Sequence, residues 1–390
     1  MSELRGRLLI GGRMVPGVLR FAGERITSIE IDSDPSPSTE LPLVAPGFVD
    51  LHVHGSGGHD PVGELAEMAA ALARAGTTAF QPTLFPAAPR ELGTIAEKVW
   101  SDAQTCNAST STPMARVVGL HLEGPFVNPL RAGALPREVL AEPSVAGLRE
   151  IVGPASGGGR GIRTVTLAPE LRGSADLISE LVRMDIRVSL GHSAATAEDA
   201  RRAALAGAVG ATHLFNAMSG IHHREVGLAG FALTSEALYA ELIGDLVHVG
   251  ADAIHLALSA RGPKGLCLVS DALKGAGHGC DVFQWHGRDH ERHDGAWYFR
   301  ASPTSEKQLA GSALSQLEMV QQLVRQGILS AEEALTMASE TPARALGMER
   351  ELGSFAPGLR ADAVVLHPRT LDLQSVLVGG RVVSPMALRQ

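Results

Sequence analysis

The stretch PGFVDLHVHG, residues 46–55, ends an apolar, β-branched run in two histidines spaced two residues apart. Side chains alternate between the two faces of a β-strand, so His52 and His54 point one way, and Leu51 and Val53 point the other. Two imidazoles side by side at the exit of a strand can hold one metal ion. The stretch therefore predicts a strand that ends in part of a metal site.

Three further segments repeat this pattern, because each places a histidine or a glutamate where an apolar run stops. They are HLEGP at residues 121–125, GHS at 191–193 and THL at 212–214. A single histidine at a strand end is usually a structural hydrogen-bonding group. Four such segments, each closing a separate predicted strand, favour a metal site instead. The predicted ligands are His52, His54, Glu123, His192 and His213.

The bulk composition predicts a globular protein. The chain has 390 residues, of which 45% are hydrophobic, so we expect a sizeable core and either one large domain with an appendage or two domains. A net charge of −8 argues against nucleic acid or an acidic membrane as a partner. The three cysteines show no metal-binding spacing, and the N-terminus lacks a long apolar segment. We therefore expect a cytoplasmic enzyme with no membrane span.

Both ends of the chain contain short β segments with turn signals between them. We expect residues 1–45 and 355–390 to form one small β-sandwich domain built from both termini. Between them, residues 46–354 alternate strand and helix patterns. The expected strands end at Val53, Leu84, Leu122, Leu167, Leu190, Leu214, Val247 and Val269.

Eight strands in this alternation predict an α/β fold, a (β/α)8 TIM-type barrel. A doubly wound sheet is the alternative, but no glycine-rich phosphate loop opens its first helix. Functional residues of such barrels gather at the C-terminal ends of the strands, where all the predicted ligands lie.

Asp271 follows the eighth strand, in LVSD at residues 268–271. A bound metal makes water more acidic, and a carboxylate beside it can take the proton and later return it. Asp271 is therefore the candidate acid/base, with a helix N-cap as its structural alternative. Some binuclear amidohydrolases bridge their metals with a modified lysine on the fourth strand. Residues 163–170 contain no lysine, so we expect Glu123 to take that role.

Taken together, these segments resemble the N-acetylglucosamine-6-phosphate deacetylase family of the amidohydrolase superfamily. The resemblance runs in order from residue 45 to residue 362 and includes THLFNAM at 212–218, HRE at 223–225 and LAGS at 309–312. It implies a divalent metal, with zinc expected, on Glu123, His192 and His213, and Asp271 as catalytic acid/base and metal contact. The His52–His54 pair implies a second ion, so one or two per subunit are expected. The resemblance also implies a homodimer and substrate contacts at Asn216, Ala217, Arg224, His248, Leu309, Ala310 and Gly311.

One departure concerns the loop after Glu123. The family usually has Gly-Ala-His there, and its histidine polarises the acetyl carbonyl, whereas this chain has Gly133, Ala134 and Leu135. Leu135 cannot donate a hydrogen bond, so another group is needed, and the His222–His223 pair is the candidate. Ala134 and Leu135 stay in the expected substrate site. A His-rich segment at residues 277–300 is expected to be a solvated insertion loop, with a second metal tract as the alternative.

The predicted activity is metal-dependent deacetylation of N-acetyl-D-glucosamine 6-phosphate to D-glucosamine 6-phosphate and acetate. The nearest alternative is the same site acting on another N-acyl substrate, such as N-acetylgalactosamine 6-phosphate or an unphosphorylated amide. A non-catalytic scaffold is a third possibility, which loss of the ligands would have indicated.

Overall fold

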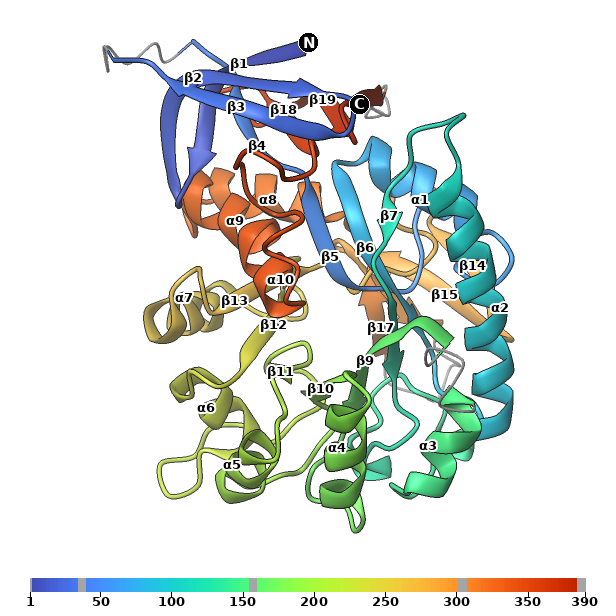
Figure 1. Cartoon of the computed structure of the whole chain (residues 1–390). Helices are drawn as coiled ribbons and strands as arrows, with labels where there is room; N and C mark the ends of the chain where they lie inside the picture. The colour runs from blue at the N-terminus through green and yellow to red at the C-terminus, as the bar shows by residue number, and fades with distance from the viewer. Residues whose placement is uncertain (1, 34–39, 154–159, 301–306, 384–390) are drawn as a thin grey trace.

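The computed structural model of the protein describes residues 2–33, 40–153, 160–300 and 307–383. Its largest unit is a barrel of parallel strands wrapped by helices (Figure 1). Within the described residues, the strands follow one another around the barrel in the order β5 (Phe48–Val53), β6 (Thr77–Leu84), β8 (Leu120–Glu123), β9 (Ile162–Leu167), β10 (Arg187–Leu190), β11 (Gly210–Ala211), β12 (Tyr239–Ile243) and β13 (Leu266–Val269). A short strand, β7 (Arg116–Val117), pairs with β6.

The barrel closes between its first strand and its last. The Asp271 amide donates to the His52 carbonyl at 2.8 Å. Deeper in the seam, the Gln316 side-chain amide donates to the Val49 and Leu268 carbonyls at 3.1 and 2.7 Å. The closed barrel confirms the predicted TIM-type fold and excludes the doubly wound alternative, which leaves its sheet edges open.

Helices cover the outside of the barrel because each presents an apolar stripe to the strands. On α4, for example, Leu177, Ile178 and Leu181 are buried. Three helices begin with reciprocal capping boxes, at Thr196, Ser315 and Ser330. The helices are α1 (Leu65–Arg74), α2 (Pro89–Ala108), α3 (Val145–Val152), α4 (Ser174–Arg183), α5 (Ala197–Leu205), α6 (Gly227–Thr234), α7 (Ala251–Arg261), α8 (Gln316–Arg325), α9 (Ala331–Ala338) and α10 (Glu340–Ala345). None of those in the described ranges is long and apolar enough to cross a membrane.

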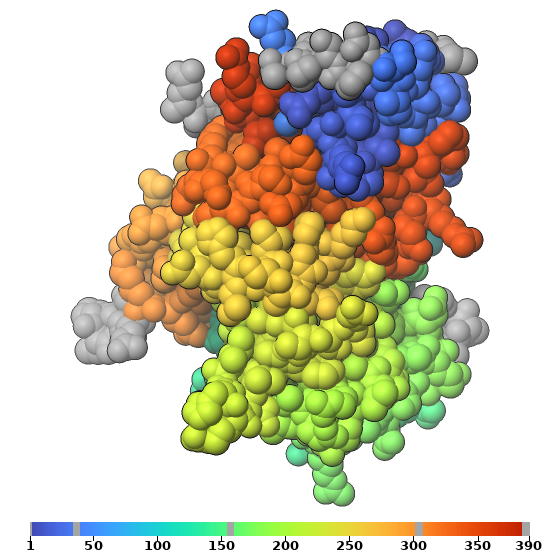
Figure 2. All heavy atoms as spheres, turned by 90° about the vertical axis from the view of Figure 1, so that its left-hand side faces the viewer, coloured from blue at the N-terminus to red at the C-terminus, as the bar shows by residue number. Residues whose placement is uncertain are grey.

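The two ends of the chain join in a second sheet, which Figure 2 shows gathered at one end of the molecule in blue and red. Its order is β20 (Arg381–Val383), β19 (Leu373–Val378), β18 (Ala363–Leu366), β4 (Leu43–Pro46), β1 (Ser2–Ile10), β2 (Arg13–Ala22) and β3 (Arg25–Ile31). Leu8, Leu19 and Phe21 share a separate core with Phe355 and Leu377. The small β unit from both termini is thus confirmed as a continuous sheet around its own core. Where one domain ends and the other begins remains a prediction.

The His-rich segment is not the solvated loop that we expected. It forms an antiparallel sheet of β14 (Val282–Trp285), β15 (Arg288–His293), β16 (Ala296–Phe299) and β17 (Gln308–Ser312). The loop expectation was wrong because charged side chains on the exposed face hid an apolar face. Trp297 is fully buried, and Trp285 and His290 are nearly so.

Two expected strand ends were also placed too late in the chain. The sixth strand, β11, ends at Ala211 rather than at Leu214, and the seventh, β12, ends at Ile243 rather than at Val247. After β12, the Asp245 carboxylate accepts from the Val247 and His248 amides, both at 2.9 Å. This local capture of backbone N–H groups by an aspartate replaces strand pairing with a turn.

Candidate metal centre and substrate site

The predicted ligands meet at the C-terminal end of the barrel. They form two groups, one of His52, His54 and Asp271 and the other of Glu123, His192 and His213, and within each group the ligand atoms lie within 4.8 Å of one another. Glu123 lies between the groups, since its Oε1 is 2.9 Å from His192 Nε2 and 3.1 Å from His213 Nε2. Its Oε2 is 3.2 Å from His54 Nε2. This position suits the bridging role that we expected for Glu123.

The tautomers of two histidines test whether this arrangement fits a cation. The Nδ1 atom of His192 lies 2.8 Å from the Arg131 carbonyl, which can only accept, so Nδ1 carries the proton. His52 Nδ1 likewise faces a carboxylate oxygen of Glu241 at 3.0 Å. In the neutral form of both rings, Nε2 presents a lone pair to the Glu123 carboxylate. Lone pairs converging on a buried carboxylate repel one another, and a divalent cation between them removes the repulsion.

The electrostatics of the protein groups agree with that fit. Burial alone would raise the pKa of Glu123, but His52, His192 and His213 hold it well below its usual range. Burial would lower the pKa of His52, yet the Asp271 and Glu123 carboxylates raise it well above its usual range. The site therefore keeps the Glu123 carboxylate ionised and attracts positive charge, which a bound metal ion would supply in place of protons.

Three of these residues have unusual backbone conformations. His192, His213 and Asp271 have φ values of 45°, 32° and 46°, in the left-handed region that L-residues seldom adopt. Such conformations cost free energy and are concentrated at functional sites. Each of these residues follows the end of a strand, and its left-handed backbone changes the direction of its side chain there. The alternation of side chains along a strand does not predict that direction.

Asp271 lies beside the first group. Its Oδ1 is 3.4 Å from His52 Nε2 and 3.5 Å from His54 Nε2, and its side chain is 13% exposed. The Asp271 carboxylate thus contacts the two histidines of its ligand group and also lines the substrate cavity. A helix N-cap is excluded as its role, because no helix of the described chain begins at this residue.

A cavity of about 180 Å³ opens onto these ligands and contains most of the predicted substrate residues. Ala134, Leu135, Asn216, Ala217, His248, Leu309 and Ala310 all line it. Four other predicted residues lie elsewhere. Gly311 is buried beside the lining residue Ala310, and Arg224 is on an exposed turn with His222 and His223. The Arg224 guanidinium donates to His223 Nε2 at 2.8 Å. Within this chain, therefore, His222 and His223 are not positioned to replace the donor that Leu135 lacks.

His248 is the cavity residue best suited to an anion. Its Nδ1 is 2.6 Å from Asp245 Oδ2. Burial would lower the pKa of His248, but the hydrogen bond and the charge of Asp245 outweigh burial and raise it. The raised pKa favours the protonated ring, which can donate from Nε2 to a bound phosphate.

Supporting residues were missed by the sequence analysis. Glu241 on β12 accepts from His52 Nδ1 and from the His213 amide, so it orients ligands of both groups. Glu170 accepts from the Ser193 hydroxyl and the Ala194 amide, which holds the loop of His192. The sequence signal for Glu241 was a carboxylate inside the apolar run YAELI. Glu170 lies in a loop, where no sequence pattern marks it.

The His-rich segment adds no second metal site. Histidines, cysteines and carboxylates come close enough to hold an ion only in the two groups above, among the residues that the structure describes. His290 instead stacks on Phe283 at 4.7 Å, and burial lowers its pKa to about 4. This histidine is therefore a neutral core residue.

A closed parallel barrel with two facing His/carboxylate groups at its C-terminal end has the architecture of a metal-dependent hydrolase. The model of the Amidohydrolase family matches residues 43–387, and the chain belongs to that family. N-acetylgalactosamine-6-phosphate deacetylase of Escherichia coli O157:H7 is 35% identical over 370 residues, 94% of each chain. N-acetylglucosamine-6-phosphate deacetylase of Bacillus subtilis strain 168 is 34% identical over 329 residues, which cover 83% of this chain and 80% of that relative.

A solved structure gives the same result. It is that of a variant of N-acetyl-D-glucosamine-6-phosphate deacetylase from Mycobacterium smegmatis in complex with N-acetyl-D-glucosamine-6-phosphate. It superposes with a TM-score of 0.85 at 29% identity, covering 98% of this chain and 99% of that one. The resemblance inferred from the sequence motifs is thereby confirmed.

Proposed function

We propose that the protein is a metal-dependent deacetylase that converts N-acetyl-D-glucosamine 6-phosphate to D-glucosamine 6-phosphate and acetate. The observation that carries the proposal is Glu123 shared between two metal-ligand groups, with Asp271 beside them at the floor of the substrate cavity. A non-catalytic scaffold is disfavoured because every predicted ligand is present and faces its group.

His52, His54 and Asp271 would hold one divalent ion, and Glu123, His192 and His213 the other, with zinc as the proposed metal. A bound divalent ion supplies Lewis-acid polarisation of the acyl carbonyl and a more acidic water. Nitrogen and carboxylate ligands in a buried site suit zinc. The number of ions per subunit, one or two, follows from whether both groups are filled.

The protein's own groups then do three things. The Asp271 carboxylate takes a proton from water as the oxygen attacks the acetyl carbon. The same carboxylate returns that proton to the amine nitrogen as the carbon–nitrogen bond breaks. His248 and the Asn216–Ala217 turn hold the phosphate end, so that the acetyl group is fixed at the metal ligands.

A second candidate substrate, N-acetylgalactosamine 6-phosphate, is favoured by one observation. The relative from Escherichia coli O157:H7, at 35% identity, is named for that sugar. The two substrates share the acetyl group and the phosphate and differ only in the configuration of one ring hydroxyl. Both substrates therefore fit the same metal-ligand groups at the acetyl end and the same His248 at the phosphate end.

A substrate panel tests the proposal. Purified protein is assayed for acetate release from both sugar phosphates and from both unphosphorylated sugars. We expect turnover of at least one phosphate and much weaker turnover of the free sugars. If neither sugar phosphate released acetate in the presence of zinc, the proposed function would be refuted. A homodimer in the cytoplasm completes the proposal, and an odd number of cysteines without metal-binding spacing suits that compartment.

A further inference from the structure

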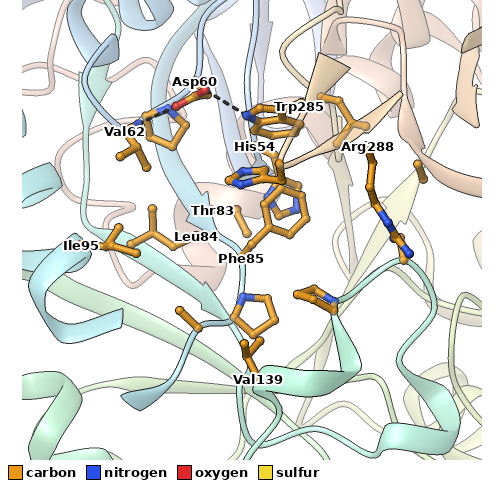
Figure 3. Close-up of a pocket in the computed structure, with 18 of the residues that line it drawn as sticks. His54, Asp60, Val62, Thr83, Leu84, Phe85, Ile95, Val139, Trp285 and Arg288 are labelled. Carbon is orange, nitrogen blue, oxygen red and sulfur yellow. Dashed lines mark hydrogen bonds between the residues drawn. The ribbon is translucent and has the colours of Figure 1, made fainter. Parts of the chain in front are cut away.

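A second cavity of about 350 Å³ adjoins the substrate site (Figure 3). It lies between the ends of β5 and β6, the turn around Val139 and the antiparallel sheet formed by the His-rich segment. The two cavities share His54, Phe85, Ala134 and Ala310 as lining residues. An acetyl methyl group does not need this space, because the smaller cavity already reaches the metal ligands.

The shared residues form a neck beside the metal centre. Phe85 stacks on the His54 ring with centroids 4.0 Å apart and an interplanar angle of 11°. Figure 3 labels both residues. The neck therefore consists of these two stacked rings and of Ala134 and Ala310, whose side chains are only methyl groups. A chain attached to a carbonyl at the metal centre can therefore continue past Phe85 into the second cavity.

The interior of this second cavity is mostly apolar. We call it the acyl annex, defined by Val62, Leu84, Phe85, Ile95, Val139 and Trp285. Trp285 is held in place by a hydrogen bond from its Nε1 to Asp60 Oδ2 at 3.0 Å. Arg288 packs over Phe299, 4.1 Å from the ring centroid. Trp285 on β14 and Arg288 on β15 thus give the antiparallel sheet one part of the annex wall.

The charges of the annex disfavour an anionic occupant. Asp60, Glu91 and Glu138 line it, and Arg288 is the cation among its lining residues. A carboxylate on the ligand would face more negative than positive groups. An uncharged hydrocarbon chain gains from burial against the apolar wall instead.

The geometry of the substrate directs its acyl group toward the annex. A hexosamine carries its acyl group at C2, and the carbon that carries the phosphoryl arm, C5, is across the ring from C2. With the phosphate at His248 and Asn216, the acyl chain runs past the metal ligands and away from the phosphate end. Neither His248 nor Asn216 lines the annex.

We propose that the acyl annex binds the alkyl chain of N-acyl groups longer than acetyl, so that the enzyme deacylates N-butyryl to N-hexanoyl hexosamine 6-phosphates. This inference rests on the proposed function. The chemistry is the same hydrolysis: the oxygen of water goes to the carboxylate, the carbon–nitrogen bond breaks and the amine nitrogen gains the proton.

The test compares kcat/KM for N-acetyl, N-butyryl, N-hexanoyl and N-succinyl glucosamine 6-phosphate, measured by amine release. Burial of each added methylene is expected to raise kcat/KM roughly fourfold. N-butyryl should therefore exceed N-acetyl, and the anionic N-succinyl compound should fall at least about tenfold below N-butyryl.

Val139→Trp fills the annex without touching a residue placed in the catalytic or binding machinery. It should lower the ratio of kcat/KM for N-hexanoyl to kcat/KM for N-acetyl at least about tenfold, the effect expected when a pocket no longer accommodates the methylene groups of a substrate. The same substitution at Val382, which is 67% exposed on β20, is the matched control and should leave the ratio unchanged. Turnover of the N-acetyl substrate reports that each variant has folded.

The outcomes separate the two proposals. Hydrolysis of N-acetyl with N-butyryl no faster than N-acetyl would overturn the annex and leave the proposed function standing. An unchanged ratio in Val139→Trp would do the same. Absence of hydrolysis for every member would overturn the proposed function, and this inference with it.

Discussion

Replacing Asp271 by asparagine tests the acid/base assignment without disturbing the backbone. Asp271 has a φ of 46°, and asparagine tolerates the left-handed region far better than alanine. The side chains have the same shape, and the Glu123, His192 and His213 group does not include residue 271. The folded structure and at least that metal group should therefore survive, with a melting temperature close to that of the wild type.

Proton transfer by a positioned group accelerates reactions by ~10²–10⁴-fold, or about 2.7–5.4 kcal/mol of transition-state stabilisation. Because Asp271 first takes and then returns the proton, kcat of Asp271→Asn should fall toward the upper end of that range. KM should change little, since residue 271 lies at the acetyl end. Steady-state acetate release measures kcat and KM, and elemental analysis measures bound metal. Asp372→Asn, at an exposed residue just before β19, is the matched control. A fall in kcat of less than about tenfold would show that Asp271 is not the acid/base.

Further predictions address the metal, the phosphate and the acyl end. Chelation should abolish activity and zinc restore it, while Glu123→Gln, which weakens both ligand groups, should reduce bound metal by elemental analysis; full activity without metal would contradict the site. Within one chain Arg224 lies on an exposed turn outside the cavity, so a ~10–10²-fold rise in KM of Arg224→Ala for the phosphorylated sugar alone is expected only through the proposed homodimer, and equal losses for the free sugar would exclude a phosphate contact. Asp245 raises the pKa of His248, so the ring is positively charged at low pH and loses that charge as pH rises through the raised pKa. KM for the phosphorylated sugar should therefore increase with pH over that range. If the pH dependence of KM were the same in His248→Asn as in the wild type, His248 would not be the phosphate contact. Leu135→His should raise kcat for N-acetylglucosamine 6-phosphate, by up to the ~10²–10³-fold of one oxyanion donor, and a slower variant that binds metal normally would show that the donor is not needed.

The residues that could be predicted from the sequence are those whose positions follow from the alternation of side chains in a strand and from the topology of the barrel. Alternation in a strand places His52 and His54 on one face, and a parallel barrel brings the ends of its strands to one rim. The ligands at four separate strand ends therefore converge whatever the details of the loops. This is why the metal groups were predictable although the sixth and seventh strands end earlier than expected.

The supporting residues could not be predicted in the same way. Glu241 is 189 positions from its partner His52, and no local pattern links the two. Arg131 contributes a backbone carbonyl, which every residue has, so its side chain gives no signal. The antiparallel sheet was missed for a different reason, since its buried face contributes only a few side chains among many charges. Tertiary packing decides which of those residues is buried.

The departure at Leu135 and the acyl annex affect the same end of the substrate. Leu135 is 5% exposed and packs with Val127 and Ala132, in a cluster that Phe85 also contacts. Phe85 in turn stacks on His54 and forms the neck of the annex. A histidine at residue 135 would place a polar ring at the edge of this apolar cluster, where it gains a hydrogen-bonding partner only when an acyl carbonyl occupies the cavity. The proposed phosphate contacts, His248 and Asn216, lie away from this apolar cluster. Changes at Leu135 and in the annex should therefore alter the acyl specificity of this enzyme and leave its contacts with the phosphate unchanged.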